Sequence, residues 1–258
     1  MKLTILGTGS PLPIPNRAQT GFLLEKDERL LLVDCGSGIY ARLQSLNVDW
    51  QRLDTVLLTH HHLDHMSDLL TIFTARWLLG YPNITVYGPR GTRSLIRQWM
   101  ALFPYVEDFV RAQTHEFNAN QVAQIAGFEV ETMEMRHFVT SLSYKFDRTL
   151  VICGDSDPLP ALKTFAQGCR LMIHECSYTD AQADQGHTNP TDLGKVLAGS
   201  NLEELWLTHF YPEAAAHGDD VVAAVKQYFT GKVCLTQDLQ QAKLSTSLNG
   251  GRPASAGG

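Results

Sequence analysis

The segment Thr59-His60-His61-His62-Leu63-Asp64-His65 directly follows an apolar run, Val56 to Leu58. The run predicts a short buried strand, so four potential metal ligands, His60, His62, Asp64 and His65, would lie in the turn after it. Imidazole and carboxylate groups suit zinc and similar metals, and the absence of cysteine here argues against a closed structural zinc site. The segment therefore favours a catalytic metal site over its alternative, a histidine-rich surface loop.

Apolar runs and helical patterns alternate outward from this segment. The first run stops at Gly7-Thr8-Gly9, but Pro11, Pro13 and Pro15 exclude the helix that a dinucleotide fingerprint requires. Hairpin strands mixed with strand-helix alternation predict an α/β fold, an αββα four-layer sandwich. We expect strands over 3–6, 21–24, 30–33, 55–58, 84–87, 128–133, 141–146, 150–153, 171–173, 205–207 and 233–235, and helices over 39–46, 69–79, 92–100, 191–198 and 219–229 and after Pro158.

Length and composition indicate one domain with a short tail. The chain has 258 residues, of which 44% are hydrophobic, enough to bury a full core. We expect a single domain over 1–244. Residues 245–258 are rich in Ser, Gly, Ala and Pro and predict a flexible C-terminal tail.

Charge and cysteine content narrow the classes of protein. The formal net charge is −6, and no run of Lys or Arg provides the basic surface typical of a nucleic-acid binder. Five cysteines without a CxxC pair argue against a disulfide framework and for free, mostly buried thiols. The N-terminus lacks the features of a signal peptide, and no apolar stretch is long enough for a membrane helix, so we expect a cytoplasmic protein.

The spacing His60-x-His62-x-Asp64-His65 resembles the HxHxDH signature of the metallo-β-lactamase superfamily, and the resemblance extends over about 1–240. Four further segments follow the order of that family, each at the end of an expected strand or in the turn after it: Asp34 in LLVDCGSG, His137 in EMRHFVTSLSYKF, Asp155 in VICGDSD and His209 in LWLTHFYP. Taken alone, His137 could be a core histidine and Asp155 a turn residue. Their joint order favours ligands from several strand ends.

The resemblance implies a metallo-β-lactamase fold and two divalent metal ions. His60, His62 and His137 would hold the first ion, Asp64, His65 and His209 the second, and Asp155 would bridge both. Asp34 would orient a ligand from behind, as metal-bound histidines usually require. The expected metal is Zn²⁺, with Mn²⁺ or Fe as alternatives. His61 would point away from the ions, and His174 would pack behind the site.

Two segments resemble the ribonuclease Z-like branch of this superfamily. Leu171-Met172-Ile173-His174-Glu175-Cys176-Ser177 is similar to its HEAT motif, and Gly186-His187-Thr188-Asn189-Pro190 to its histidine motif. The resemblance implies that His187 acts near the scissile phosphate, as a proton donor or stabilising group, and that Glu175 orients it. A turn carboxylate and an exposed loop histidine are the alternatives.

The chain departs from ribonuclease Z between His137 and Asp155, where those enzymes usually carry a long tRNA-gripping arm and this chain has room for one hairpin. The missing arm and the acidic charge favour small substrates, such as cyclic or aryl phosphodiesters or sulfate esters, over tRNA precursors. RNA stays possible if a partner subunit supplies contacts, and relatives of this branch are often homodimers. Six aromatic residues could line an apolar pocket or pack in the core: Trp77, Tyr81, Phe103, Tyr105, Phe109 and Tyr211.

We therefore expect a binuclear metal-dependent hydrolase, a phosphodiesterase that uses a metal-bridging hydroxide and keeps Asp64, Glu175 and His187 as catalytic groups. Arylsulfatase and thioesterase or lactonase activities are the alternatives, since the ligand set alone does not exclude them. Asp155 replaces the cysteine of β-lactamases, and no flavodoxin-like domain follows, which disfavours β-lactamase and flavodiiron functions. A non-enzymatic binding module is disfavoured as well, because such a protein does not need a complete set of metal ligands.

Overall fold

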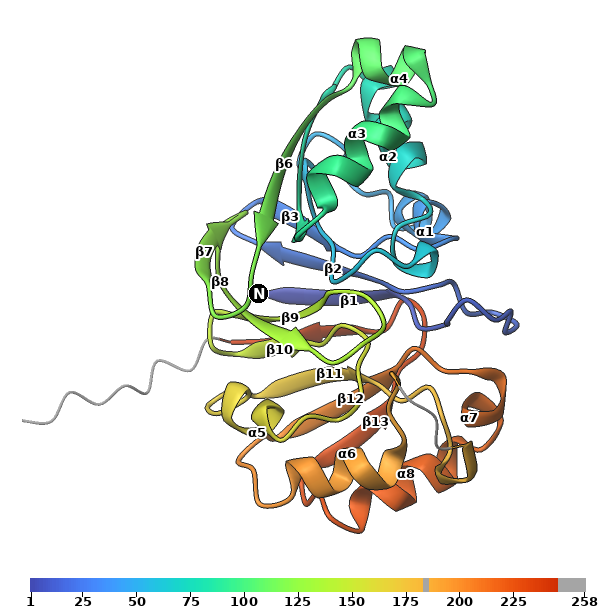
Figure 1. The fold of residues 1–258 in the computed structure, drawn as a ribbon, viewed down its shortest axis with the longest axis vertical. Helices are drawn as coiled ribbons and strands as arrows, with labels where there is room; N and C mark the ends of the chain where they lie inside the picture. Colours follow the sequence, from blue (N-terminus) through green and yellow to red (C-terminus); the bar gives the residue numbers. More distant parts are fainter. Residues whose placement is uncertain (183–185, 246–258) are drawn as a thin grey trace, which may run out of the picture.

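Two mixed β-sheets form the centre of the computed structural model, which describes residues 1–182 and 186–245 (Figure 1). The first sheet has the strand order β14-β1-β2-β3-β4-β5-β6 and the second β13-β12-β11-β10-β9-β8-β7. The first comprises β1 (Lys2–Gly7), β2 (Gly21–Lys26), β3 (Arg29–Val33), β4 (Thr55–Leu57), β5 (Asn83–Pro89), β6 (Arg111–Phe117) and β14 (Gln241–Lys243). The second comprises β7 (Val122–Ile125), β8 (Phe128–Met135), β9 (Ser141–Phe146), β10 (Leu150–Ile152), β11 (Leu171–Glu175), β12 (Glu204–Thr208) and β13 (Lys232–Leu235).

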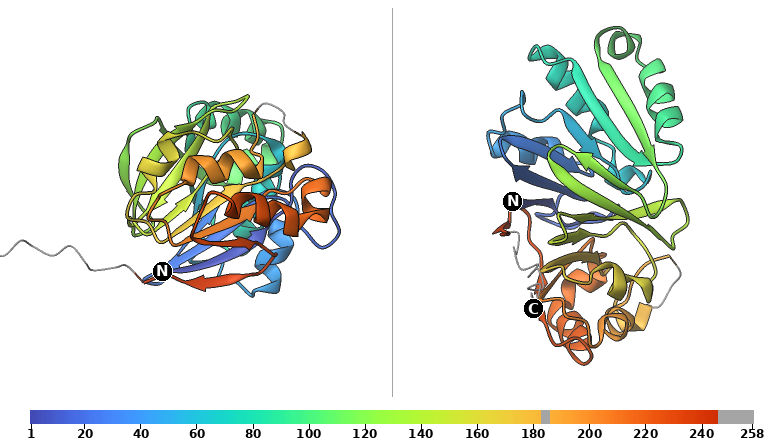
Figure 2. Two further views of the ribbon diagram at one scale, coloured as in Figure 1. Left: turned by 90° about the horizontal axis from the view of Figure 1, so that it is seen from below. Right: turned by 90° about the vertical axis from the view of Figure 1, so that its left-hand side faces the viewer.

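Helices cover the outer face of each sheet, which confirms the expected αββα sandwich (Figures 1 and 2). The first sheet carries α1 (Ile39–Ser45), α2 (Leu69–Leu78), α3 (Thr92–Ala101) and α4 (Pro104–Phe109). The second carries α5 (Ala161–Phe165), α6 (Pro190–Leu197), α7 (Pro212–Ala216) and α8 (Gly218–Lys226). Single 3₁₀ turns lie at Leu63–His65 and Asp180–Gln182. No helix of the described ranges is long and apolar enough to span a membrane.

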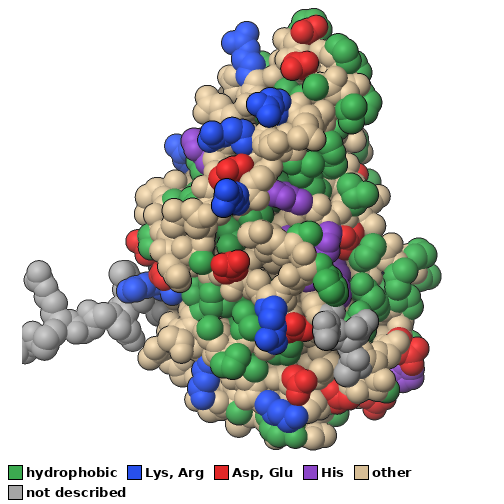
Figure 3. All heavy atoms as spheres, viewed as in Figure 1, with side chains coloured by type: hydrophobic (Ala, Val, Ile, Leu, Met, Phe, Trp, Pro, Cys, Tyr) green, Lys and Arg blue, Asp and Glu red, His purple; other side chains and the backbone are tan. Residues whose placement is uncertain are grey.

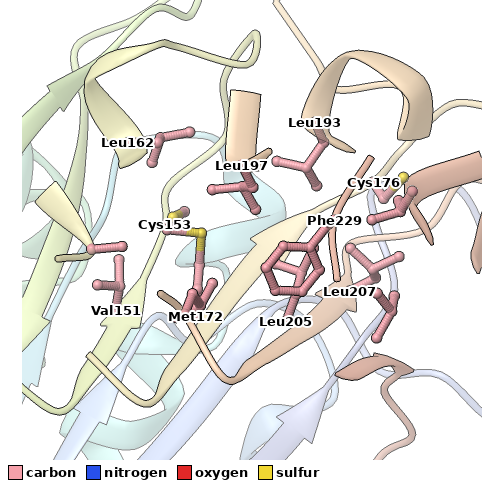
Figure 4. Packing of buried hydrophobic residues seen from close by; sticks show 14 of the residues in the cluster. Val151, Cys153, Leu162, Met172, Cys176, Leu193, Leu197, Leu205, Leu207 and Phe229 are labelled. Atoms are coloured by element: carbon pink, nitrogen blue, oxygen red, sulfur yellow. The ribbon is translucent and has the colours of Figure 1, made fainter. Parts of the chain in front are cut away.

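Three hydrophobic clusters hold the four layers together. The cluster between the sheets joins inward side chains of β1, such as Leu3 and Ile5, to those of β9 and β10, such as Tyr144 and Ile152. A second cluster seats α1–α3 on the first sheet. The third packs Leu193 and Leu197 of α6 against β11 and β12 (Figure 4). Because each sheet buries both faces, its central strands are continuous apolar runs, which made them predictable.

The direction of the strands gathers functional residues at one edge. β3–β6 run parallel to one another, and so do β10–β13. The carboxyl ends of parallel strands in one sheet lie at the same edge, where ligands usually bind. The turns after β4, β10 and β12 therefore emerge near one another although they are far apart in the sequence.

The structure adds elements that the sequence did not predict, namely β6, β7, β14, α4 and α7. β6 and β7 are edge strands with mostly exposed or half-buried side chains, so they lack the apolar pattern of a buried strand. β9 and β10 form the single hairpin expected between His137 and Asp155. The predicted tail over 245–258 lies outside the described residues except for Ser245.

Candidate metal centre

Seven potential ligands meet where the two sheets present the ends of their strands. The turn after β4 supplies His60, His62, Asp64 and His65, and the segments after β8, β10 and β12 supply His137, Asp155 and His209. Ligand atoms of His60, His62, His137 and Asp155 lie within 4.8 Å of one another, as do those of Asp64, His65 and His209. Both groups bring together residues that the sequence assigned to one ion, and a third group of ligand atoms, from Asp155, His187 and His209, overlaps them. Histidine side chains appear close together at the middle of the face in Figure 3.

Asp155 lies at the centre of both groups. Its Oδ2 atom is 3.7 Å from Nε2 of His60, 3.4 Å from Nε2 of His65 and 3.2 Å from Nε2 of His209. Ligands around a tetrahedral zinc ion, with bonds of about 2.0–2.2 Å, are separated by about 3.4 Å. The separations at Asp155 therefore fit a carboxylate shared by two cations.

Two buried nitrogens support the same interpretation. Nε2 of His60 and Nε2 of His65 have no hydrogen-bond partner within the described part of the chain, although both side chains are fully buried. A buried polar atom without a partner costs about 1–3 kcal/mol. A cation bound to these atoms removes that cost, so the residues present fit a metal centre.

In His65, His137 and His209 the Nδ1 atom has a hydrogen-bond partner on the side away from the other ligands. Nδ1 of His65 lies 2.8 Å from Oδ2 of Asp34, as expected for an orienting carboxylate, and Asp34 also accepts hydrogen bonds from Thr59. Nδ1 of His137 lies 2.6 Å from the carbonyl oxygen of Gly186, and Nδ1 of His209 lies 2.9 Å from Oγ of Ser177. Such partners fix the tautomer and turn Nε2 toward the centre.

Burial and neighbouring charge set the protonation of the ligands. Burial alone would raise the pKa of Asp155, but its interactions with His209 and His65 outweigh that effect and hold the pKa well below its usual range. Burial, together with the charge of His65, lowers the pKa of His60 well below its ordinary value. Asp155 is therefore an anion and His60 a neutral imidazole, the forms that bind cations.

His187 and Glu175 form a buried pair beside this centre. Nδ1 of His187 lies 2.9 Å from Oε1 of Glu175 and 3.9 Å from Oδ2 of Asp155. Burial alone would lower the pKa of His187, but the hydrogen bond and charge of Glu175 raise it to about 9. His187 therefore holds a proton at neutral pH, and its Nε2 lies 3.5 Å from the hydroxyl of Tyr211.

Comparison with known proteins assigns the chain to a family. A family model described as "Anti-Pycsar protein Apyc1" matches residues 1–229. The chain belongs to this Apyc1 family. Ribonuclease Z from Mycobacterium avium (strain 104) is 26% identical, with 95% of this chain and 98% of that protein covered.

Solved structures agree with the fold of this Apyc1-family chain. YhfI from Bacillus subtilis, a metallo-β-lactamase fold protein, has a TM-score of 0.81 and 24% identity over 93% of this chain and 98% of its own. Human tRNase Z, short form, has a TM-score of 0.72 and 24% identity over 94% and 99%. The chain is thus a ribonuclease Z-like member of the metallo-β-lactamase superfamily, as the HxHxDH segment predicted, and these relationships support a metal-dependent hydrolase.

Apart from Tyr211, the other histidines and aromatics considered in this Apyc1-family chain make their contacts away from the candidate metal ligands. His61 bonds Thr92 through Nε2 at 2.8 Å, and His174 is buried with Nδ1 on the carbonyl oxygen of Glu175, as expected. Trp77 stacks on Phe109 of α4, and a groove between α2 and α4 contains Phe103 and Tyr105 but none of the ligands. Of the six aromatic residues considered for a substrate pocket, Tyr211 is the one with a ring contact to His187.

Sequence reasoning missed the supporting hydroxyls of Thr59 and Ser177. Thr59 precedes the HxHxDH segment and its Oγ lies 3.0 Å from Nδ1 of His60. Ser177 ends the HEAT-like segment, at the position of the motif's threonine. A hydroxyl retained next to a ligand or catalytic segment was the available signal in both cases.

Gly36 packs directly against the turn that carries Asp64. A Cβ atom at Gly36 would lie 2.0 Å from the carbonyl oxygen of Asp64 and 2.6 Å from Cβ of Gln19. Overpacking of this kind costs about 1–3 kcal/mol. We expect Gly36→Ala to lower both the melting temperature and the metal content of purified protein. Gly80→Ala, with nothing within 4 Å but a φ of +88°, is the control and should keep its metal; equal metal content in the two variants would contradict this prediction.

Removal of metal should destabilise the fold, because a cation binds the folded donor set and not the unfolded chain. A ligand at 100 times its Kd stabilises a protein by about 2.7 kcal/mol, which corresponds to about 5–10 °C for a domain of this size. We expect a strong chelator to lower the melting temperature by that amount and added Zn²⁺ to restore it. Differential scanning fluorimetry measures both steps, and a melting temperature indifferent to chelator would contradict a structural contribution from metal.

Proposed function

We propose that this chain is a phosphodiesterase with two divalent metal ions, Zn²⁺ or alternatively Mn²⁺ or Fe. The observation that carries the proposal is the His187–Glu175 pair, placed 3.9 Å from the central carboxylate of Asp155. Ligand sets of this kind serve several hydrolases, but a protonated histidine beside them suits an ester whose leaving oxygen needs a proton. The chain is similar to ribonuclease Z, whose name denotes the cleavage of RNA and therefore of a phosphodiester, and this similarity supports the choice.

The proposed ligands are His60, His62 and His137 for one ion, Asp64, His65 and His209 for the other, and Asp155 for both. When bound, two cations supply a hydroxide at neutral pH and stabilise charge on the phosphate oxygens. Asp64, whose Oδ2 lies 3.0 Å from Nε2 of His209, would accept the proton of the attacking water. His187 donates its proton to the leaving oxygen, and Glu175 keeps the imidazole oriented and charged.

The surface around the site favours a small substrate. Only the β9–β10 hairpin lies between His137 and Asp155, so the described residues provide no long arm there to hold a folded RNA. We therefore propose cyclic or aryl phosphodiesters as the substrate class, with RNA as the alternative. A single catalytic domain over 1–244, a homodimer and a cytoplasmic location stay predictions.

The first test compares three ester classes on protein of known metal content: bis(p-nitrophenyl) phosphate, p-nitrophenyl sulfate and a thioester. We expect turnover of the phosphodiester to exceed that of the other two by at least about 100-fold, which corresponds to about 2.7 kcal/mol of transition-state discrimination. Faster turnover of the sulfate or the thioester would replace the phosphodiesterase proposal with arylsulfatase or thioesterase activity. Protein with two bound metals and no phosphodiester turnover would overturn it.

A further inference from the structure

Ser177 lies in the middle of a buried chain of hydrogen bonds between the proposed metal centre and the proton donor. Its side chain is completely buried. Its Oγ atom lies 2.9 Å from Nδ1 of His209 and 2.5 Å from Oε2 of Glu175. Glu175 then contacts His187 through its other oxygen, Oε1, at 2.9 Å. One hydroxyl therefore connects a ligand of the proposed second metal to the catalytic pair.

The direction of these hydrogen bonds follows from the donors available. An ionised carboxylate only accepts, and a serine hydroxyl has one hydrogen to donate. Oε1 of Glu175 already accepts from the backbone N–H of Ser156 and from His187. The Ser177 hydroxyl has two possible acceptors, Oε2 of Glu175 at 2.5 Å and the carbonyl oxygen of His209 at 3.0 Å, and its hydrogen goes to the shorter contact, with the charged carboxylate. The lone pairs of Oγ are then free to accept Nδ1–H of His209. In that tautomer Nε2 of His209 has no hydrogen and faces Oδ2 of Asp64 at 3.0 Å.

We propose that Ser177 is a positioning residue that couples metal binding at His209 to the orientation of His187, an inference that rests on the proposed function for its catalytic part. His209 would hold a cation through Nε2, and its Nδ1–H would then be a stronger donor to Ser177. The stronger bond fixes the hydroxyl, which in turn holds Glu175 against His187. Because coupling between sites is reciprocal, loss of the hydroxyl weakens both metal binding and proton donation.

The first arm of the test measures metal affinity and needs no substrate. Zn²⁺ binding is measured by chelator competition for wild type, Ser177→Ala, Ser177→Thr and Ser10→Ala. We expect Ser177→Ala to weaken binding about 10- to 100-fold, the usual effect of losing a group behind a metal ligand. Ser177→Thr keeps the hydroxyl and should bind within about threefold of wild type, a smaller change than the loss expected for Ser177→Ala. Ser10 is also buried, and its hydroxyl has no partner among the described residues, so Ser10→Ala controls for the loss of a buried hydroxyl.

Either of two affinity results would overturn the proposal. The first is a Zn²⁺ affinity of Ser177→Ala equal to that of wild type. The second is a loss of affinity in Ser177→Thr as large as that in Ser177→Ala, which would mean that the shape of the side chain, and not its hydroxyl, determines metal binding. If Ser177→Ala does not fold, Ser177→Cys takes its place, because a thiol has nearly the same size but is a weak donor and acceptor. The same loss of affinity is expected for it.

The second arm tests coupling to the catalytic pair at saturating Zn²⁺. We expect Ser177→Ala to lower kcat about 10- to 100-fold for a phosphodiester with an alkyl leaving group, whose departure depends on the proton donor. Combined with Glu175→Gln, it should lower kcat by less than about threefold further, because residues that act through one another are not additive. Independent, multiplying losses would overturn the coupling. If wild type has no phosphodiester turnover, the proposed function fails, while the affinity arm still decides the role of Ser177 at the metal.

Discussion

Replacing Asp155 by Asn is expected to reduce phosphodiester hydrolysis by at least about 1000-fold and to leave the purified protein without its full complement of metal. Oδ2 of Asp155 lies 3.2–3.7 Å from the inward nitrogens of His60, His65 and His209, and its low pKa keeps it negatively charged. An amide has the same shape but no charge with which to hold two cations. Metal ions contribute several kcal/mol to such reactions, and about 4 kcal/mol corresponds to 1000-fold.

The measurement pairs initial rates with metal analysis by mass spectrometry. Asp147→Asn is the matched control. Asp147 lies in the turn after β9, away from the proposed ligands, and forms an ion pair with Lys26 of β2. The control should keep both its metal and its rate. A rate and metal content in Asp155→Asn close to those of Asp147→Asn would remove Asp155 from the centre and, with it, the assignment of the bridging ligand.

Replacing His187 by Ala is expected to lower kcat by about 100- to 10,000-fold, the usual contribution of a general acid, while both metals stay bound. His187 contacts Glu175 through Nδ1, so its Nε2, 3.5 Å from the hydroxyl of Tyr211, is the nitrogen left to act on a substrate, and no proposed cation depends on His187 as a ligand. The loss should be smallest for esters with p-nitrophenolate as the leaving group, because a stable anion needs little help from a proton donor. It should be largest for alkyl leaving groups.

His217→Ala is the control for this second prediction, since His217 lies exposed on the helical side of the second sheet, where it contacts Glu213. A uniform loss for aryl and alkyl esters would argue that His187 stabilises the phosphate and does not donate the proton. A simultaneous loss of metal would mean that it is a ligand, in accord with the distance-based group that joins it to Asp155 and His209.

Much of the fold was predictable because its central strands are apolar runs with sharp ends. Val56 to Leu58 and Leu171 to Ile173 are such runs, and both became buried strands. β6 could not be predicted in this way, since its polar side chains leave no pattern and pairing with β5 determines the strand. Local sequence predicts burial well but not which exposed segment completes the edge of a sheet.

The candidate site was predictable to the extent that its chemistry lies in residue types with fixed spacing. His60, His62, Asp64 and His65 need only one turn to come together. The contact of Ser177 with His209 depends on β11 and β12 lying side by side, and nothing in either segment alone indicates it. The aromatics failed as a guide for the same reason, because a ring such as Trp77 fills a gap between helices as readily as it lines a pocket.

The two groups of proposed metal ligands also have a consequence for how the chain folds. Each group takes side chains from both sheets, so His60 and His62 of the first half meet His137, and Asp64 and His65 meet His209 across more than half of the chain. Such distant closures are late events in folding, because the chain entropy they cost is recovered only when both partners are already ordered. Metal would therefore bind after the two sheets have packed together, and it would then stabilise the contact between the two halves of the chain. A newly synthesised chain without metal should reach a nearly native fold in which the two halves separate more readily. Unfolding of this metal-free protein should therefore begin at the interface between the two sheets.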